Sequence, residues 1–256
     1  MAKPLVSIIT PTHARPSLLP LIYACVQRQD WPNVEWLVDD DSAAPSIFMQ
    51  SLSDERVRYH HDPDRRAIGA KRNYLVEQAR GEYIVHFDDD DYYSPQYITH
   101  MLSEMTSRGA DLVKLSGFFL YNTNYNLLAY WNLMAKLGIH FVWSSEAMEA
   151  IVLTDRNNDR FSEVHLGFGF SYVYKRLLWD SVKFIDIDWN EDGEFIKAAT
   201  TEESRAYVSD RIGLCLHLFH SSNSSRCFPQ FLIPPFLVER LFPEARPHLR
   251  ALAAPG

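Results

Sequence analysis

Short hydrophobic stretches alternate with helical patterns along the first 110 residues of the chain. Strands are expected at residues 5–10, 34–38, 57–60 and 83–87, and the first of these is rich in β-branched residues, which is typical of a buried strand. Apolar residues at helical spacing predict helices over 18–29 and 69–80, and a third helix is expected from Pro95 to about Arg108. Gly81 is expected to end the second helix as a left-handed cap. This alternation predicts an α/β fold with a largely parallel sheet.

The pattern becomes less regular after residue 110. A strand is expected at 112–115, and the Asn-rich stretch 122–126 is typical of a turn. The aromatic side chains of 118–143 suit either core packing or a stacking platform for a sugar, and the pattern does not choose between them. Residues 144–152 begin like a capped helix. The proline-containing end, 229–256, is interpreted as a tail that packs on the domain or on a partner.

Composition narrows the class of protein. The chain has 256 residues, is 46% hydrophobic and carries a net charge of -8, which is ordinary for a globular protein and excludes a basic nucleic-acid footprint. The three cysteines are too few and too widely spaced for a disulfide framework or a zinc pattern, so free thiols are expected. No apolar run approaches the ~20 residues that span a bilayer. We therefore expect a cytoplasmic protein without a transmembrane segment. Peripheral membrane contact and a homo-oligomer formed through the tail stay open.

The most informative polar cluster is the run of four aspartates from Asp88 to Asp91, which follows an expected buried strand. Four adjacent carboxylates raise one another's pKa unless a cation is present, and hard oxygen ligands suit Mg²⁺ or Mn²⁺. A solvated acidic loop or a helix cap is the alternative. A calcium loop of the helix-loop-helix type is excluded because Tyr93 stands where glycine is needed, and Tyr92 argues against a haloacid-dehalogenase-type phosphatase.

Four further clusters carry polar side chains at element ends. Asp39, Asp40 and Asp41 follow a second strand and suit either a nucleotide contact or a turn. Residues 69–73 open a helix with two cations, which favours phosphate or forms a solvated basic face. Near the other end, Glu191-Asp192 starts a helix as a candidate base or a cap, and His217 and His220 end an apolar strand as candidate metal or phosphate ligands or as structural histidines.

Taken in order, these segments resemble the family 2 inverting glycosyltransferases of GT-A fold. The resemblance is dense over residues 5–95, extends to about 226 and is sparse over 110–160. The matching segments are the strand Val6–Thr12, the "VDDGS"-like Leu37–Ser42, the "ARN…GEYI"-like Gly69–Asn73 with Ala79–Ile84, the DXD-containing Phe87–Pro95, the "ED"-like Trp189–Asp192 and the "H..N.S"-like His220–Arg226.

The resemblance implies a fold and a set of roles. The fold would be GT-A, a Rossmann-like α/β fold whose mixed, mostly parallel sheet is flanked by helices. Asp192 would be the general base, with Glu191 the second choice, and Asp90 would ligate a metal that His220 approaches. Nucleotide-binding roles would fall to Thr10, Pro11, Thr12, Asp39, Asp40, Arg72, Asp88 and Asp89. Asp41 departs from the family pattern because glycine is usual there, which puts the local backbone in doubt.

The expected reaction is metal-dependent transfer of a sugar, with inversion, from a nucleotide-diphosphate sugar to a hydroxyl of a glycan or other acceptor. UDP is the favoured nucleotide and Mn²⁺ or Mg²⁺ the expected cofactor. Residues 1–110 would form the nucleotide-binding half and 111–228 the acceptor-binding half of one domain. Two alternatives are a nucleotide-sugar pyrophosphorylase and a non-catalytic sugar- or metal-binding module. The first normally has a Gly-rich phosphate loop, and residues 13–16 contain no glycine.

Overall fold

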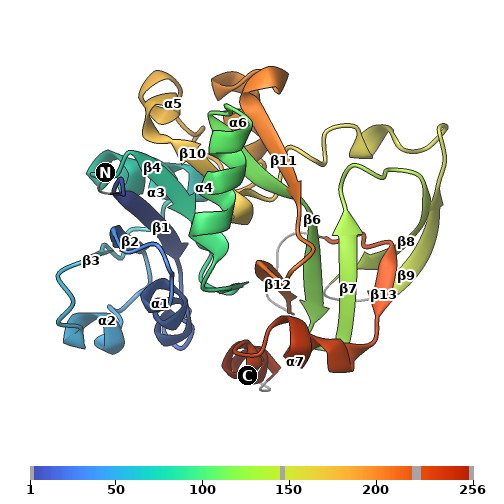
Figure 1. Cartoon of the computed structure of the whole chain (residues 1–256). Helices are drawn as coiled ribbons and strands as arrows, with labels where there is room; N and C mark the ends of the chain where they lie inside the picture. Colours follow the sequence, from blue (N-terminus) through green and yellow to red (C-terminus); the bar gives the residue numbers. More distant parts are fainter. Residues whose placement is uncertain (1–2, 145–147, 221–225, 254–256) are drawn as a thin grey trace. The chain divides into compact units, whose positions relative to one another are not determined.

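The computed structural model describes residues 3–144, 148–220 and 226–253. The chain divides into two compact units (Figure 1). The first is made of Met1–Asp89, Pro95–Lys114 and Leu166–Tyr207, and the second of Asp90–Ser94, Leu115–His165 and Val208–Gly256. The run of four aspartates is therefore shared, with Asp88 and Asp89 in the first unit and Asp90 and Asp91 in the second.

The first unit is built on a mostly parallel sheet in the order β10-β4-β1-β2-β3. Its strands are β1 (Val6–Thr12), β2 (Val34–Asp40), β3 (Val57–His61), β4 (Tyr83–His86) and β10 (Val173–Lys175). The first four are parallel, and β10 is antiparallel to β4. All four strands expected in this region are confirmed. Strand β2 extends beyond its expected end, so that Asp39 and Asp40 are its last two residues.

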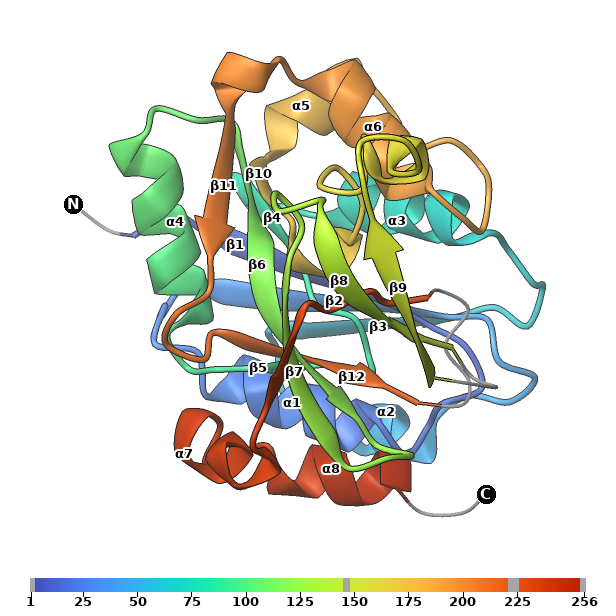
Figure 2. The same cartoon turned by 90° about the vertical axis from the view of Figure 1, so that its right-hand side faces the viewer.

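Helices cover both faces of this sheet. In Figure 2, α1 and α2 lie on one side of β1, β2 and β3, and α3, α5 and α6 lie on the other. Helices α1, α3, α4 and α6 confirm the expected ones, whereas α2 and α5 have no counterpart among the expected elements. The helices of this unit are α1 (Leu19–Gln27), α2 (Ile47–Ser51), α3 (Ile68–Gln78), α4 (Tyr97–Ser107), α5 (Arg176–Ser181) and α6 (Glu191–Ala199).

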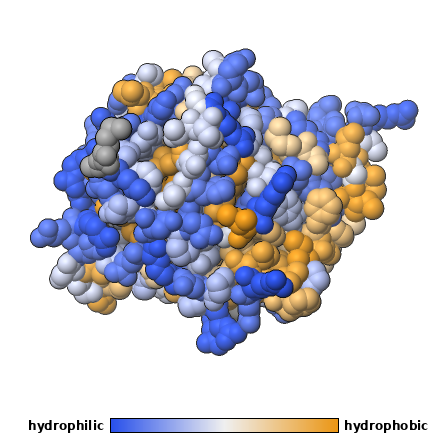
Figure 3. Space-filling model, viewed as in Figure 1, coloured by the Kyte–Doolittle hydropathy of each residue, from blue (hydrophilic) through white to orange (hydrophobic). Residues whose placement is uncertain are grey.

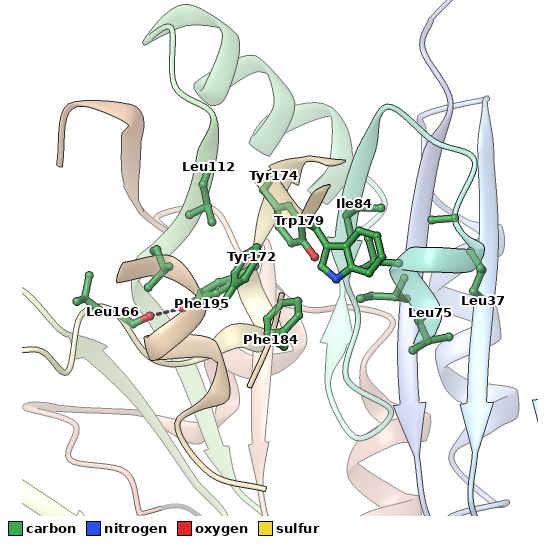
Figure 4. Packing of buried hydrophobic residues seen from close by; sticks show 14 residues of the cluster. Leu37, Leu75, Ile84, Leu112, Leu166, Tyr172, Tyr174, Trp179, Phe184 and Phe195 are labelled. Carbon is green, nitrogen blue, oxygen red and sulfur yellow. Dashed lines mark hydrogen bonds between the residues drawn. The ribbon is translucent and has the colours of Figure 1, made fainter. Parts of the chain in front are cut away.

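A buried cluster joins α3, α5 and α6 to the sheet (Figure 4). Phe195 of α6 stacks on Phe184 with ring centroids 4.1 Å apart and also packs on Tyr174 of β10. Stacked aromatic side chains bury large areas and fix orientation. The packing therefore holds α6, and with it the acidic first turn of this helix, against the sheet.

Gly81 does not have the role expected of it. Helix α3 ends at Gln78, the following residue Ala79 has extended backbone angles, and Gly81 is not among the glycines with positive φ. Instead, an added Cβ at Gly81 would lie 2.6 Å from the backbone nitrogen of Ser7, and the Gly81 N–H donates to Ser7 Oγ at 2.8 Å. The left-handed cap was a wrong prediction, because this glycine is required by close approach of two backbones rather than by its φ angle.

The second unit contains short antiparallel hairpins and one parallel pair. Strand β7 pairs with β6, β12 pairs in parallel with β6 and antiparallel with β5, and β13 pairs with β7. A turn at 122–126 joins β6 to β7, as expected, and Asn126 adopts a φ of 54° there. Strand β11 (Arg205–Ser209), whose first three residues belong to the first unit, pairs with β6. The other strands are β5 (Tyr92–Tyr93), β6 (Leu112–Asn122, whose first three residues belong to the first unit), β7 (Leu127–Asn132), β8 (Gly138–Trp143), β9 (Met148–Leu153), β12 (Cys215–Phe219) and β13 (Phe231–Ile233).

The helix expected at 144–152 is wrong. Residues 145–147 lie outside the described part of the chain, and Met148–Leu153 form β9, which pairs with β8 along its whole length. The β-branched Ile151 and Val152 favour extended backbone, and the pairing with β8 outweighs the cap-like start of the segment. Apolar side chains of this hairpin remain exposed, among them Ile139 and Val152. Orange surface is visible on the right of Figure 3, the side on which Figure 1 draws these strands and β13.

The aromatic region and the proline-containing end both contribute to the core of the second unit. Phe118, Trp131 and Trp143 are almost completely buried, so core packing explains these members of the aromatic region. Phe242, close to α7 (Val238–Leu241), packs on Phe119 at 5.5 Å between ring centroids. The last element is α8 (Arg246–Ala253). Among the described helices of both units, none is long and apolar enough to cross a membrane.

Candidate active site

In the first unit, threonines at the end of β1 connect this strand to the segment after β4. Thr10 Oγ1 donates to the carbonyl of Phe87 at 2.8 Å and accepts from Trp36 Nε1 at 2.9 Å. Thr12 Oγ1 donates to Asp89 Oδ2 at 2.6 Å. Pro11, between them, is half-buried. These two hydrogen bonds from the end of β1 therefore hold the Phe87 carbonyl and the Asp89 carboxylate in place.

Asp39 and Asp40 at the end of β2 are both buried but have different partners. Asp39 Oδ1 contacts His60 Nδ1 at 2.8 Å and Arg66 at 2.7 Å, while its Oδ2 is buried and has no hydrogen-bond partner among the described residues. Asp40 accepts from the Ser42 N–H at 2.9 Å and from the Tyr59 hydroxyl at 2.6 Å. Asp40 is thus held rigidly at the strand end by donors to both of its carboxylate oxygens.

Asp41, where the family pattern has glycine, is buried and accepts from several basic groups. Lys71 Nζ donates to it at 2.7 Å, Arg65 at 2.8 Å and the Arg66 N–H at 2.9 Å, and His13 lies 2.8 Å away. Burial alone would raise the pKa of Asp41, but these donors hold it well below its ordinary value. Asp41 therefore links the ends of β1 and β2 to the start of α3, which explains why a side chain is accepted at this turn.

The aspartates that follow β4 are paired with guanidinium groups. Asp89 Oδ1 accepts from Arg15 at 2.8 Å, and Asp88 Oδ1 lies 3.7 Å from Arg72 NH2. Arg72 is buried and also forms an ion pair with Glu191. Burial alone would lower the pKa of Arg72, but Glu191 and Asp88 raise it above its ordinary value. One guanidinium thus connects the segment after β4 to the first turn of α6.

Glu191 and Asp192 occupy very different environments although they are adjacent. Glu191 is buried, and burial raises the pKa of its carboxyl although Arg72 opposes this. Asp192 is half-buried. Its Oδ2 accepts from the Gly169 N–H at 2.5 Å and its Oδ1 from the Gly193 N–H at 2.7 Å. Each carboxylate oxygen keeps a second lone pair for another donor. The geometry favours Asp192 over Glu191 as a base.

In the second unit, two histidines of the β12 segment face the other two aspartates of the run. His220 Nε2 lies 3.1 Å from Asp90 Oδ2. Asp91 is completely buried, lies 2.9 Å from His217 Nδ1 and accepts from the Leu218 N–H. Burial alone would lower the pKa of His217, but the Asp91 carboxylate raises it well above its ordinary value. The Asp91–His217 pair is therefore a buried ion pair.

A comparison with protein families decides how this site is classified. Residues 7–132 match the model described as glycosyl transferase family 2. This part of the chain belongs to glycosyltransferase family 2. The resemblance proposed from the motifs is therefore confirmed.

Two curated bacterial proteins illustrate the relationship. The putative colanic acid biosynthesis glycosyl transferase WcaA of Escherichia coli K12 is 34% identical over 105 residues, which are 40% of this chain and 38% of WcaA. The uncharacterized glycosyltransferase EpsJ of Bacillus subtilis is 27% identical over 217 residues, which are 81% of this chain and 59% of EpsJ. The chain spans less than two thirds of the length of these relatives.

Solved structures of low sequence identity share the fold. The structure of Staphylococcus aureus TarS residues 1–349 in complex with UDP matches 84% of this chain and 60% of that chain, with a TM-score of 0.60 and 16% identity. The mixed, mostly parallel sheet flanked by helices is consistent with the GT-A fold of these neighbours, which confirms the fold prediction.

Family 2 glycosyltransferases generally use a divalent metal. Among the described residues, no group of three or more His, Cys, Asp or Glu side chains is arranged to hold a metal ion. Mg²⁺, however, commonly takes only one or two carboxylates and completes its shell with phosphate oxygens and water. The Asp90 carboxylate beside His220 fits such a site. Ser221, Asn223 and Ser225, which belong to the "H..N.S"-like segment His220–Arg226, lie outside the described residues.

Most residues expected at the site do contact one another within their own units. Thr12 contacts Asp89, and Arg72 contacts both Asp88 and Glu191, and the roles assigned to all of them stay predictions. Sequence reasoning missed Arg15, Lys114 and Gly169, whereas Lys71 was one of the two cations noted in residues 69–73. Arg15 and Lys114 are cations that act over long sequence separations, for which the sequence contains no signal. The sequence does contain a signal for Gly169, because Gly167-Phe168-Gly169 is a glycine-rich stretch among aromatic residues.

Proposed function

We propose that the protein is an inverting glycosyltransferase that moves a sugar from a nucleotide-diphosphate sugar to a hydroxyl of an acceptor. The observation that carries the proposal is the placement of Asp192. Its carboxylate is half-exposed at the first turn of α6, is oriented by two backbone N–H groups, and stands beside a glutamate that is already paired with Arg72. Such a group can accept a proton from an acceptor hydroxyl.

Contacts in the first unit support a nucleotide-binding role for its strand ends. Thr10, Pro11, Thr12, Asp39, Asp40, Arg72, Asp88 and Asp89 are the residues we assign to the nucleotide. Asp40 is a fixed acceptor, and open α/β sheets bind ligands beyond the carboxyl ends of their strands. UDP is the favoured nucleotide, since the similar TarS structures contain UDP and UDP-GlcNAc.

A divalent metal, Mn²⁺ or Mg²⁺, is assigned to Asp90, with His220 as its neighbour. When bound, the metal would offset the charge that develops on the leaving nucleoside diphosphate. The chain's own residues do the rest. Asp192 takes the proton from the acceptor hydroxyl. The ion pair of Glu191 with Arg72 holds the first turn of α6 in place, and Asp88 attracts the Arg72 guanidinium toward the residues that we assign to the nucleotide.

The stereochemical outcome follows from the use of a single base. The deprotonated hydroxyl attacks the anomeric carbon from the face opposite the diphosphate, the bond to the diphosphate breaks, and the configuration inverts through an oxocarbenium-like state. The name of WcaA refers to colanic acid biosynthesis, so we extend the proposal to polysaccharide biosynthesis with a glycan acceptor.

Turnover of a panel of UDP-sugars with Mn²⁺ or Mg²⁺ tests the proposal. We expect release of UDP from at least one donor, at first with water and faster with a glycan acceptor, and loss of this release with a metal chelator. Proton NMR of the product should show the anomeric configuration opposite to that of the donor. Retention of configuration would contradict the inverting mechanism.

The same assay separates the alternative functions. A nucleotide-sugar pyrophosphorylase would consume pyrophosphate and the UDP-sugar and form UTP, whereas a non-catalytic module would bind UDP, raising the melting temperature, without turnover. Either result with a folded protein would contradict the proposal. No structural observation favours these alternatives, and residues 13–16 hold Arg15 against Asp89 rather than forming a glycine-rich loop.

A further inference from the structure

Lys114 is a completely buried lysine in the part of β6 that belongs to the first unit. Burying an ammonium group is costly unless its N–H groups have partners. Lys114 Nζ donates to the carbonyl of Gly167 and lies 5.6 Å from the centre of the Tyr172 ring. Burial lowers the pKa of Lys114 to about 7, although Asp192 opposes this. An apolar side chain would fill this space at a lower free-energy cost, so we expect a specific role for the Lys114 amine.

The partner of Lys114 belongs to residues 166–171, which we call the support loop. Four of its carbonyls accept from side-chain hydroxyls or amines. Phe168 in this loop has φ 65° and ψ 55°, a left-handed conformation that costs free energy for a bulky residue and persists only where surrounding contacts impose it. The four pairs are Tyr172 Oη with Leu166, Lys114 Nζ with Gly167, Ser171 Oγ with Phe168, and Tyr97 Oη with Ser171.

The support loop touches the residue assigned as the base. The Gly169 N–H donates to Asp192 Oδ2 at 2.5 Å, and an added Cβ on Gly169 would lie 2.8 Å from Asp192 Cβ. The Tyr172 hydroxyl also lies 3.2 Å from the backbone carbonyl of Asp192. Figure 4 shows Tyr172 beside Phe195 of α6, with its hydroxyl directed to Leu166. Lys114, Tyr172 and Asp192 are therefore connected through one short segment.

We propose that the support loop is a positioning element for Asp192, and that Lys114 and Tyr172 hold the loop in the conformation that aims this carboxylate. The inference rests on the proposed role of Asp192 as the base. Lys114 acts through the carbonyl of Gly167 and through the loop. A displacement of a catalytic group by about 1 Å can reduce a rate by about a hundredfold, so release of the loop should slow the chemical step.

Two variants test the proposal by kinetics. Lys114→Met removes the amine, and Tyr172→Phe removes only the hydroxyl. With the UDP-sugar that the wild-type protein turns over fastest, we expect kcat to fall about ten- to a hundredfold for Lys114→Met and about tenfold for Tyr172→Phe. The donor KM should stay within about twofold. Should Lys114→Met fail to fold, Tyr172→Phe alone decides the question.

Matched controls are available in the same unit. Lys175→Met removes a half-exposed lysine that is paired with Asp111. Tyr174→Phe keeps the ring of another completely buried tyrosine and removes only its hydroxyl, which contacts His86. Both controls should keep the wild-type kcat. An unchanged kcat in folded Tyr172→Phe and Lys114→Met would overturn the proposal.

Combination with Asp192→Asn shows whether Lys114 acts through the base. Residues that act as a unit are not additive, so Lys114→Met should cause no further loss in the Asp192→Asn background. An equal loss in both backgrounds would overturn the positioning role while leaving the base assignment intact. If Asp192→Asn alone retained full turnover, the base assignment would be the part that fails.

Crystal structures of the two variants provide a readout that needs no activity. We expect the distance from Gly169 N to Asp192 Oδ2 to exceed hydrogen-bonding range in Lys114→Met, and Phe168 to leave its left-handed conformation. If the support loop and Asp192 keep their positions in both variants, the proposal is wrong even if the protein turns over no UDP-sugar.

Discussion

The two units hold parts of the same run of four aspartates, and they hold them with different partners. In the first unit, Asp88 and Asp89 are paired with arginine side chains, Arg72 and Arg15. In the second unit, Asp90 and Asp91 face His220 and His217. Guanidinium groups keep their charge at any physiological pH, whereas imidazoles titrate and bind metals. The different partners support the different roles that we propose for the members of this run.

The comparison also separates the two aspartates of the second unit. Asp91 is completely buried and accepts from both His217 and the Leu218 N–H, which is the environment of a structural ion pair. Asp90 is less deeply buried, and its contact with His220 is compatible with a shared metal. We therefore expect loss of stability from a change at Asp91 and loss of donor binding from a change at Asp90.

The largest effect on stability is expected from Asp91→Asn. The change leaves the His217 cation buried without its counterion, which typically costs about 3–5 kcal/mol. Urea unfolding at neutral pH measures the difference. Asp155→Asn, at an exposed turn in the same unit, is the control and should change the free energy of unfolding by less than about 0.5 kcal/mol. Equal stability of the two variants would contradict the structural role of Asp91.

Asp90→Ala should act on metal-dependent binding rather than on folding. In the wild-type protein, UDP with Mn²⁺ should raise the melting temperature more than UDP alone, because a ligand of the folded state stabilises it. The variant should lose this increment, with an affinity for UDP and Mn²⁺ that is weaker by at least about tenfold. A full metal-dependent increment in Asp90→Ala would show that the metal is held elsewhere.

In the first unit, a buried lysine should make the free energy of unfolding depend on pH. Lys114 has a pKa of about 7 in the folded protein, well below its ordinary value of 10.5. Between these values the unfolded chain binds more protons, so the penalty from Lys114 is complete below pH 7 and is relieved as the pH rises. The wild-type protein should gain about 2 kcal/mol from this group between pH 7 and pH 9.

The comparison of interest is between the wild-type protein and Lys114→Met, because other groups titrate in the same range in both. Unfolding by urea at the two pH values should show the gain of about 2 kcal/mol in the wild-type protein only, relative to the variant. If the free energy of unfolding depended on pH in the same way in both proteins, burial would not lower the pKa of Lys114.

Sequence patterns predicted the first unit far better than the second. The strands and helices up to residue 110 combine regular spacing with clear ends, and local periodicity is enough to locate them. Residues 144–152 show why the rest is harder. Their caps and charges suit a helix, yet pairing with β8 makes Met148–Leu153 a strand. Gly81 was expected to provide a left-handed φ angle and is instead required by the proximity of Ser7.

The candidate site was located in part through its motifs. Asp192, Arg72 and the aspartate run stand in family-like segments, so the sequence identified them as candidates. Their partners are another matter. Lys114 contacts Gly167 across 53 positions, and Arg15 contacts Asp89 across 74. Side-chain contacts of this kind follow from the tertiary fold and leave no spacing pattern in one sequence.

The central claim is that the Asp192 carboxylate is the general base, and Asp192→Asn tests it most directly. Turnover of the preferred UDP-sugar should fall by about a thousandfold, while the donor KM and the affinity for UDP stay within about twofold. Glu194→Gln, on the same first turn and partly exposed, is the matched control and should keep wild-type turnover. If Asp192→Asn retains more than about a tenth of the wild-type turnover, Asp192 is not the base.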